Sequence, residues 1–231
     1  MKLSRLLTFI KKRKYIIIAT VCCAIIGLVA IIPSIKTSVK PKYEYTIVID
    51  AGHGGRDGGS VGDISVEKDL NLKYAKALQK LLGKANINVI MTRTDDDGLY
   101  DENADNKKLS DMRARRDIIR NAQPDLVVSV HMNSYPLANC MGAKTFYKMD
   151  SEASFNAAKA VQNSLHYYID NASSTISKGD YYILNCTDYT SILIECGFIS
   201  TPSEEQLLND DAYCEKFMYS VYCGIMLYLG F

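Results

Sequence analysis

A short apolar run occurs three times in the sequence, and it limits the folds that the chain can adopt. Each time it stops at a titratable residue or at a glycine loop that contains one. Runs of β-branched residues of this length predict buried strands. If the strands are parallel neighbours, their carboxyl ends meet at one sheet edge, where α/β proteins place their chemistry. The sequence then predicts a His/His/carboxylate cluster of the type that holds catalytic zinc. The runs are residues 47–49, 126–130 and 192–194, followed by His53, His131 and Glu195.

The chain after residue 42 alternates between predicted strands and predicted helices. The alternation predicts an α/β fold: a single domain with a mostly parallel or mixed, twisted sheet and helices on both faces. Residues 93–110 are polar without a period and predict a long surface loop near the site. The predicted strands are residues 43–50, 87–91, 126–130, 143–148, 181–184 and 191–195, and the predicted helices are residues 67–82, 111–121, 151–169 and 211–229.

The N-terminal segment predicts a membrane anchor. Residues 1–14 are basic, residues 15–32 are uncharged, and residues 33–42 form a linker to the domain at 43–231. The uncharged run is longer than the roughly 7 to 15 residues of a signal-peptide core and reaches the roughly 17 to 25 that span a bilayer. Because the basic residues precede the span, residues 1–14 are expected in the cytoplasm and the domain outside it. A cleaved signal peptide is the alternative, and it also leaves the domain outside.

Charge and cysteine content exclude some functions. The net charge is +1, from 27 basic and 26 acidic residues, so no polyanionic partner such as nucleic acid is expected. The cysteines beyond the apolar run are odd in number and scattered, so they imply no disulfide framework. The glycine loop at residues 52–59 lacks the Gly-Lys-Ser/Thr ending of a phosphate-binding loop.

Four motifs, in order and spacing, resemble those of the zinc-dependent N-acetylmuramoyl-L-alanine amidases, which hydrolyse cell-wall peptidoglycan. The resemblance extends from about residue 45 to the C-terminus. Ala51 departs from the proline usual before the Gly-His pair, but no ligand is lost. A short, membrane-anchored chain without wall-binding repeats is most similar to the spore-cortex, germination-specific amidases of endospore formers. The motifs are Gly-His-Gly-Gly within residues 47–55, Glu-Lys-Asp-Leu within 67–72, Ser-Val-His-Met-Asn within 129–134 and Glu-Cys-Gly-Phe within 194–200.

The resemblance implies a role for each motif residue. It implies that Zn²⁺ is held by His53, Glu67 and His131, and that Glu195 is the catalytic acid/base. The implied substrate is peptidoglycan, meaning glycan strands that bear stem peptides, and an accessory protein is a further partner to consider. Arg116 resembles the family's arginine on the helix before the second histidine, and its role stays open.

Position on the predicted elements also favours Glu67 over three nearby aspartates as the third ligand. Glu67 begins a helix that packs on the sheet, so its backbone is anchored and its carboxylate gains from the positive helix end. Asp57 and Asp63 lie in the glycine-rich segment. Asp69 points about 200° around the helix from Glu67 and should face away.

The residue types suit amide hydrolysis, which needs an activated water and a proton for the departing amine. Zinc with three protein ligands and one open position lowers the pKa of its bound water to about 7. Glu195 would take up a proton and pass it to the alanine nitrogen. Two alternatives stay open. One is a catalytically weak peptidoglycan-binding scaffold. Such a protein would usually have lost at least one of the four residues His53, Glu67, His131 and Glu195. The other is a different zinc amide hydrolase, although no His-Glu-x-x-His helix is present.

Overall fold

The three apolar runs form neighbouring strands at the centre of a six-stranded sheet with the order β2-β1-β3-β6-β4-β5. In this computed structural model, β1 pairs in parallel with β2 and β3, and β6 pairs in parallel with β3. β4 runs antiparallel to β6 and parallel to β5, so the sheet is mixed. The strands are β1 (Thr46–Ala51), β2 (Asn88–Met91), β3 (Leu126–Asn133), β4 (Lys144–Lys148), β5 (Ser177–Gly179) and β6 (Ser191–Phe198).

The structure describes residue 13 and residues 43–136 and 140–231. The predicted basic segment, membrane span and linker lie outside the described residues, except for Arg13. Within the described part of the chain, every helix is too short or too polar to cross a membrane. Residues 43–231 form one unit with its own core. The predicted α/β domain is therefore confirmed, and the anchor stays a prediction.

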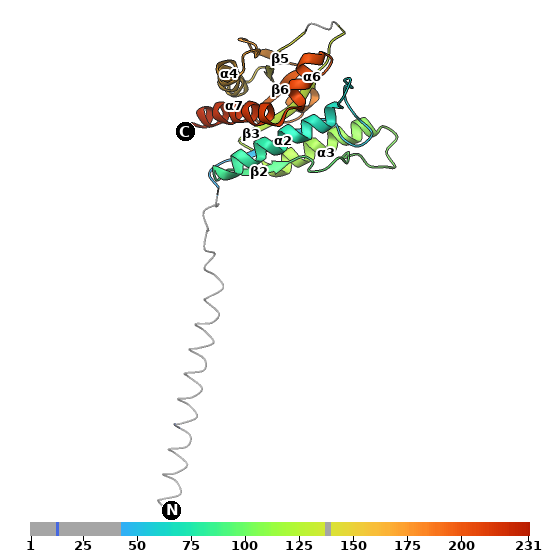
Figure 1. The fold of residues 1–231 in the computed structure, drawn as a ribbon. Coiled ribbons are helices and arrows are strands. Elements are labelled where there is room, and N and C mark those ends of the chain that lie inside the picture. Colours follow the sequence, from blue (N-terminus) through green and yellow to red (C-terminus); the bar gives the residue numbers. More distant parts are fainter. Residues whose placement is uncertain (1–12, 14–42, 137–139) are drawn as a thin grey trace, which may run out of the picture. The chain divides into compact units, whose positions relative to one another are not determined.

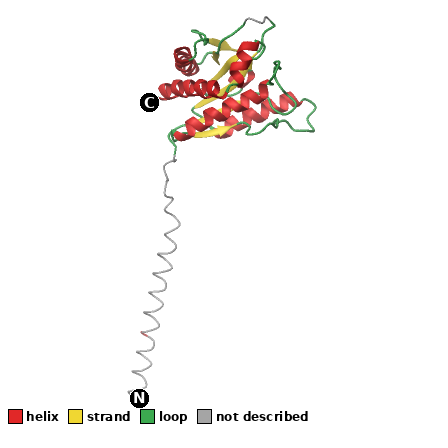
Figure 2. Cartoon of the chain, in the orientation of Figure 1, coloured by secondary structure: helices red, strands yellow, loops and turns green. Residues whose placement is uncertain are grey.

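Helices cover both faces of the sheet, as the alternation predicted (Figures 1 and 2). Successive side chains of a strand point to opposite faces. Ile47 and Ile49 of β1 therefore pack into the larger core, with α2, α4 and α7, whereas Val48 packs into the smaller core, with α3 and α5. The helices are α2 (Glu67–Lys84), α3 (Lys107–Ala122), α4 (Glu152–Tyr168), α5 (Tyr182–Asn185), α6 (Pro202–Asn209) and α7 (Asp211–Leu229).

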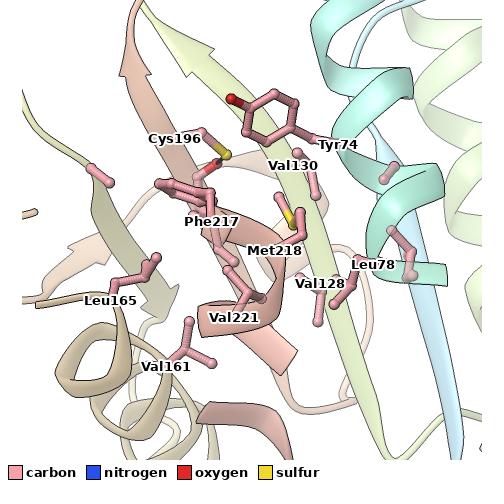
Figure 3. Packing of buried hydrophobic residues seen from close by; sticks show 14 of the residues in the cluster. Tyr74, Leu78, Val128, Val130, Val161, Leu165, Cys196, Phe217, Met218 and Val221 are labelled. Carbon is pink, nitrogen blue, oxygen red and sulfur yellow. Dashed lines mark hydrogen bonds between the residues drawn. The ribbon is translucent and has the colours of Figure 1, made fainter. Parts of the chain in front are cut away.

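The larger core fixes α2 against the sheet. Figure 3 shows Tyr74 and Leu78 of α2 close to Val128 and Val130 of β3, with Phe217 of α7 beside them. The rings of Tyr74 and Phe217 meet at 5.7 Å between centroids, and the Tyr74 hydroxyl donates to the Leu208 carbonyl at 3.2 Å. Because one face of α2 is buried against the sheet, its first residue, Glu67, has a fixed position at the sheet edge.

Some predicted elements differ from the observed ones. Residues 181–184, predicted as a strand, contain the start of α5, because a short aromatic and β-branched run fits a strand and a buried helical turn equally well. Helix α3 begins at Lys107 rather than 111, since the Asn106 side chain accepts from the Leu109 amide and caps it. β5 and α6 were not predicted.

Candidate metal centre

The four predicted site residues come together at the carboxyl edge of the parallel strands. His53 lies two residues beyond β1 in a left-handed backbone conformation, with φ of 62°. Glu67 is the first residue of α2. His131 and Glu195 are direct partners in the pairing of β3 with β6, so their side chains point to the same face. Both strands continue past these residues, so the two side chains lie within strands rather than at their ends.

Three of the four side chains converge like the ligands of one ion. One ligand atom each from His53, Glu67 and His131 lie within 4.8 Å of one another. Glu67 Oε1 is 2.9 Å from His131 Nδ1 and 3.2 Å from His53 Nε2. Two imidazole nitrogens and one carboxylate oxygen are a donor set that zinc accepts, with room for a fourth ligand. The predicted donors therefore fit the predicted metal.

Glu67 is buried and held in its charged form. Burial alone would raise its pKa, but His131 and His53 outweigh burial and bring it well below the usual range. The backbone amide of Ser60 donates to Oε2 at 2.8 Å, and the side-chain amide of Asn71 donates to Oε1 at 3.3 Å. A carboxylate fixed by several donors is ready to bind a cation without reorganising.

Glu195 has the opposite environment. The residue is 8% exposed, and its Oε2 has no hydrogen-bond partner among the described residues. Burial raises its pKa to about 7, with the Glu67 charge adding to the shift and the two histidines opposing it. A carboxyl group with this pKa exchanges a proton readily at neutral pH, as a general acid/base must.

Asp57 lies behind His53. Its Oδ1 is 2.9 Å from His53 Nδ1, although that nitrogen has no partner at hydrogen-bond geometry. Its other oxygen pairs with Lys108. Asp57 therefore faces the ring nitrogen of His53 that does not face Glu67, a position that can orient the ring. Asp63 and Asp69 are exposed and lie outside the cluster.

Two buried arginines hold the backbone of the His53 loop. Arg93 donates to the carbonyl oxygens of Ala51 and Gly52, each at 2.9 Å. Arg115 donates to those of Ala51 at 2.8 Å and His53 at 2.5 Å. It also pairs with Asp50 at 2.7 Å. These contacts fix the loop that carries the first histidine.

The sequence prediction missed both arginines. Arg93 was placed in a surface loop but is buried. Arg116, which resembles the family's arginine on this helix, instead pairs with its neighbour Asp117. A signal for Arg115 was present, since Asp111, Arg115 and Ile119 recur at a spacing of four and so share one helix face. Asp111 does pair with Arg115, at 2.6 Å.

A cavity of about 450 Å³ opens over this group. His53, Glu67, His131 and Glu195 all line it. The side chains of the two histidines are 18% and 19% exposed, so the cluster is accessible from the cavity. The arrangement is that of a ligand cluster beside a proton-exchanging carboxyl group, open to a substrate.

An α/β fold that groups three potential metal ligands beside a buried carboxyl group is typical of metal-dependent hydrolases. Within that class, the chain belongs to the N-acetylmuramoyl-L-alanine amidase family, whose model matches residues 47–226. The predicted family and enzyme class are thereby confirmed.

Three similar proteins are named as amidases or as an amidase catalytic domain. The germination-specific N-acetylmuramoyl-L-alanine amidase of Bacillus subtilis (strain 168) is 35% identical over 187 residues, which cover 79% of this chain and 78% of the relative. The CwlD amidase from Clostridioides difficile, solved in complex with the GerS lipoprotein, is 36% identical with a TM-score of 0.77, covering 80% of this chain and 98% of that one. The catalytic domain of CwlV from Bacillus (Paenibacillus) polymyxa var. colistinus is 27% identical with a TM-score of 0.71, covering 80% and 98%.

Proposed function

We propose that this protein hydrolyses the amide bond between N-acetylmuramic acid and L-alanine in peptidoglycan, with zinc held by His53, Glu67 and His131. The observation that carries the proposal is the convergence of these three donors beside Glu195, a buried carboxyl group with an unpartnered oxygen. Burying an unpartnered polar atom costs free energy, so the unpartnered oxygen of Glu195 favours a functional site over a purely structural ion-pair cluster.

Glu195 performs the proton transfers in this proposal. When bound, zinc supplies Lewis-acid polarisation at the reacting centre. Glu195 takes a proton from the attacking water at Oε2, and the pKa of about 7 lets it release that proton again. The proton goes to the alanine nitrogen as the carbon–nitrogen bond breaks. The products are a stem peptide with a free amino terminus and a glycan with a free lactyl carboxylate.

We place this activity in the maturation of spore-cortex peptidoglycan. The support is the similarity to the germination-specific amidase of Bacillus subtilis and to CwlD. Since CwlD was solved in complex with the GerS lipoprotein, an accessory lipoprotein is the partner we would seek first.

The activity has a direct test. Purified wall fragments are incubated with the zinc-loaded protein and analysed by mass spectrometry. Release of intact stem peptides with a new alanine amino terminus is the expected result, and Glu195→Gln is the control. If wall fragments are bound but stay intact with both proteins, a scaffold role replaces the amidase proposal.

The domain is proposed to act outside the cytoplasm, tethered through residues 15–32. The uncharged run and the basic residues before it support this topology. Protease added to intact protoplasts should digest the domain, whereas its full protection would contradict the orientation. Retention of residues 15–32 in the mature protein, read by mass spectrometry, distinguishes an anchor from a cleaved signal peptide.

A further inference from the structure

Two kinds of side chain line the cavity over the candidate metal centre. Tyr181 and Tyr182, which are 37% and 42% exposed, form an aromatic wall. Lys108 and Asp111 from α3 are charged lining residues, and α3 contacts the helix α5 that follows Tyr181. A substrate in the cavity therefore meets an aromatic surface as well as charged groups.

Tyr181 is fixed in place on the aromatic wall. Its ring meets that of Phe146 edge to face, with 5.4 Å between centroids and an interplanar angle of 82°. Its carbonyl oxygen accepts the first backbone bond of α5, from the Leu184 amide at 3.1 Å, and another from the Asn185 side chain at 3.0 Å. The ring is therefore held by β4 and the backbone by α5, which makes Tyr181 a preformed contact surface.

The hydroxyl of Tyr181 is available to a ligand. It has no hydrogen-bond partner among the residues that the structure describes. Burial and the nearby Glu195 carboxylate raise the pKa of this hydroxyl, so it stays protonated and can donate. Tyr181 and Glu195 line the same cavity.

The aromatic wall matches one half of the proposed substrate. The carbonyl side of the scissile amide leads to a neutral sugar, which has apolar C–H faces and many hydroxyl groups. The nitrogen side leads to a peptide that carries ionised carboxylates. An aromatic ring with a polar tip suits the sugar, because it can cover a C–H face and donate to a hydroxyl group. Lys108 and Asp111 already pair with Asp57 and Arg115, so they offer the sugar no comparable surface.

We propose that Tyr181 contacts the muramoyl sugar, packing its ring against the sugar face and donating from its hydroxyl. This inference rests on the proposed amidase function and assigns the orientation of the substrate in that site. Tyr181 is a substrate-binding residue in this account, and Glu195 remains the residue that exchanges protons.

The test compares two substrates that share the same amide. One is a muramoyl tripeptide, and the other is the matching N-lactoyl tripeptide, which lacks the sugar ring. Tyr181→Ala should lower kcat/KM about tenfold for the first, the equivalent of about 1.4 kcal/mol. It should change kcat/KM less than about twofold for the second. A defect in folding would affect both substrates alike, so the difference isolates the sugar contact.

Two variants complete the comparison. Tyr181→Phe keeps the ring and its contact with Phe146. It should therefore lower kcat/KM for the muramoyl tripeptide less than Tyr181→Ala does, through loss of the hydroxyl contact alone. Tyr167→Ala is the matched control, since Tyr167 is 80% exposed on α4 and does not line the cavity. Tyr167→Ala should leave kcat/KM unchanged for both substrates.

A binding measurement covers the case in which the N-lactoyl peptide is cleaved too slowly to measure. The Kd of zinc-loaded protein for a peptide-free muramoyl disaccharide should rise about tenfold in Tyr181→Ala, and the Kd for the free tripeptide should stay unchanged. Equal losses for both ligands, or no loss for either, overturn the sugar contact while the amidase function stands. Failure of the wild-type protein to cleave wall fragments would instead remove the amidase function.

Discussion

Glu67 and Glu195 are the same residue type a short distance apart, and the protein treats them in opposite ways. Glu67 lies between two imidazoles and accepts from Ser60 and Asn71, so it stays charged. Glu195 is buried with one oxygen unpartnered, and its pKa rises to about 7. The environment rather than the residue type separates the proposed metal ligand, Glu67, from the proposed acid/base, Glu195.

The backbone explains how one site can hold both carboxylates. Glu67 begins a helix, and the positive end of the helix favours its negative charge. Glu195 lies within β6 between Ile194 and Cys196, both of which point into the larger core. Both carboxyl groups are buried, so the difference lies in their partners: the helix end and two imidazoles stabilise the charge of Glu67, whereas Oε2 of Glu195 has no partner among the described residues.

Removing Glu67 should weaken zinc binding. Glu67→Ala should weaken zinc binding by more than about 100-fold, since loss of a residue behind the ligands already costs roughly 10 to 100-fold. Titration with a competing chelator measures the change. Asp63→Ala and Asp69→Ala are matched controls and should bind zinc as wild type does, while Asp57→Ala should fall between. The ligand assignment fails if any of the three aspartates ranks above Glu67.

Neutralising Glu195 should lower turnover but leave zinc binding unchanged. Glu195→Gln should lower kcat by about 100-fold or more, the usual size of a general acid/base contribution, because glutamine cannot exchange a proton. Elemental analysis should still find one zinc per chain. Wild-type turnover in this variant would remove Glu195 from the mechanism.

The buried ion pair under the His53 loop should matter for stability more than for chemistry. Arg115→Met leaves Asp50 buried without its cation, which should lower the free energy of unfolding by about 3 to 5 kcal/mol. Urea unfolding of the zinc-loaded protein measures this loss. Arg116→Met is a matched control on the next residue and should leave the unfolding midpoint nearly unchanged, because Arg116 pairs with Asp117 near the surface, where ion pairs contribute little. Equal midpoints for the two variants would refute the role given to Arg115.

Asp50 should make stability fall in acid. Burial alone would raise its pKa, but the Arg115 charge and the Ser129 hydroxyl outweigh burial and lower it to about 2. Because the pKa of Asp50 is lower in the folded protein than in the unfolded chain, ionised Asp50 stabilises the fold fully at pH values above about 4. This stabilisation is lost as the pH falls towards 2. The contribution is about 2 kcal/mol. Urea midpoints measured between pH 5 and 2 should slope less in Asp50→Asn, and an unchanged slope would assign the acid sensitivity to other groups.

The sequence was informative where apolar pattern and motif agreed. The three runs predicted neighbouring parallel strands, and the pairing of β1, β3 and β6 confirms this. Because those strands fix where their following residues lie, the grouping of His53, His131 and Glu195 could be predicted from the runs. Glu67 could be added only through the motif resemblance and its place at a helix start.

Some of the missed parts depend on contacts between distant segments, and others had a local signal. Arg93 and Arg115 have ordinary surface composition around them, and only the folded loop supplies the carbonyl oxygens that they bind. Helix α6 had a readable signal, Pro202 at its start with Glu204 and Glu205 in the first turn. The three-residue strand β5 has no pattern of its own, because its pairing with β4 decides its conformation.

The ends of the sheet have a consequence for a protein proposed to act at a cell surface. The outer strands are β2, with four residues, and β5, with three, while the longest strands lie inside. A short outer strand offers few unpaired backbone groups to a strand from another molecule. The long apolar strands that build the site are thereby kept from joining neighbouring copies into fibrous aggregates, even where many copies are crowded together.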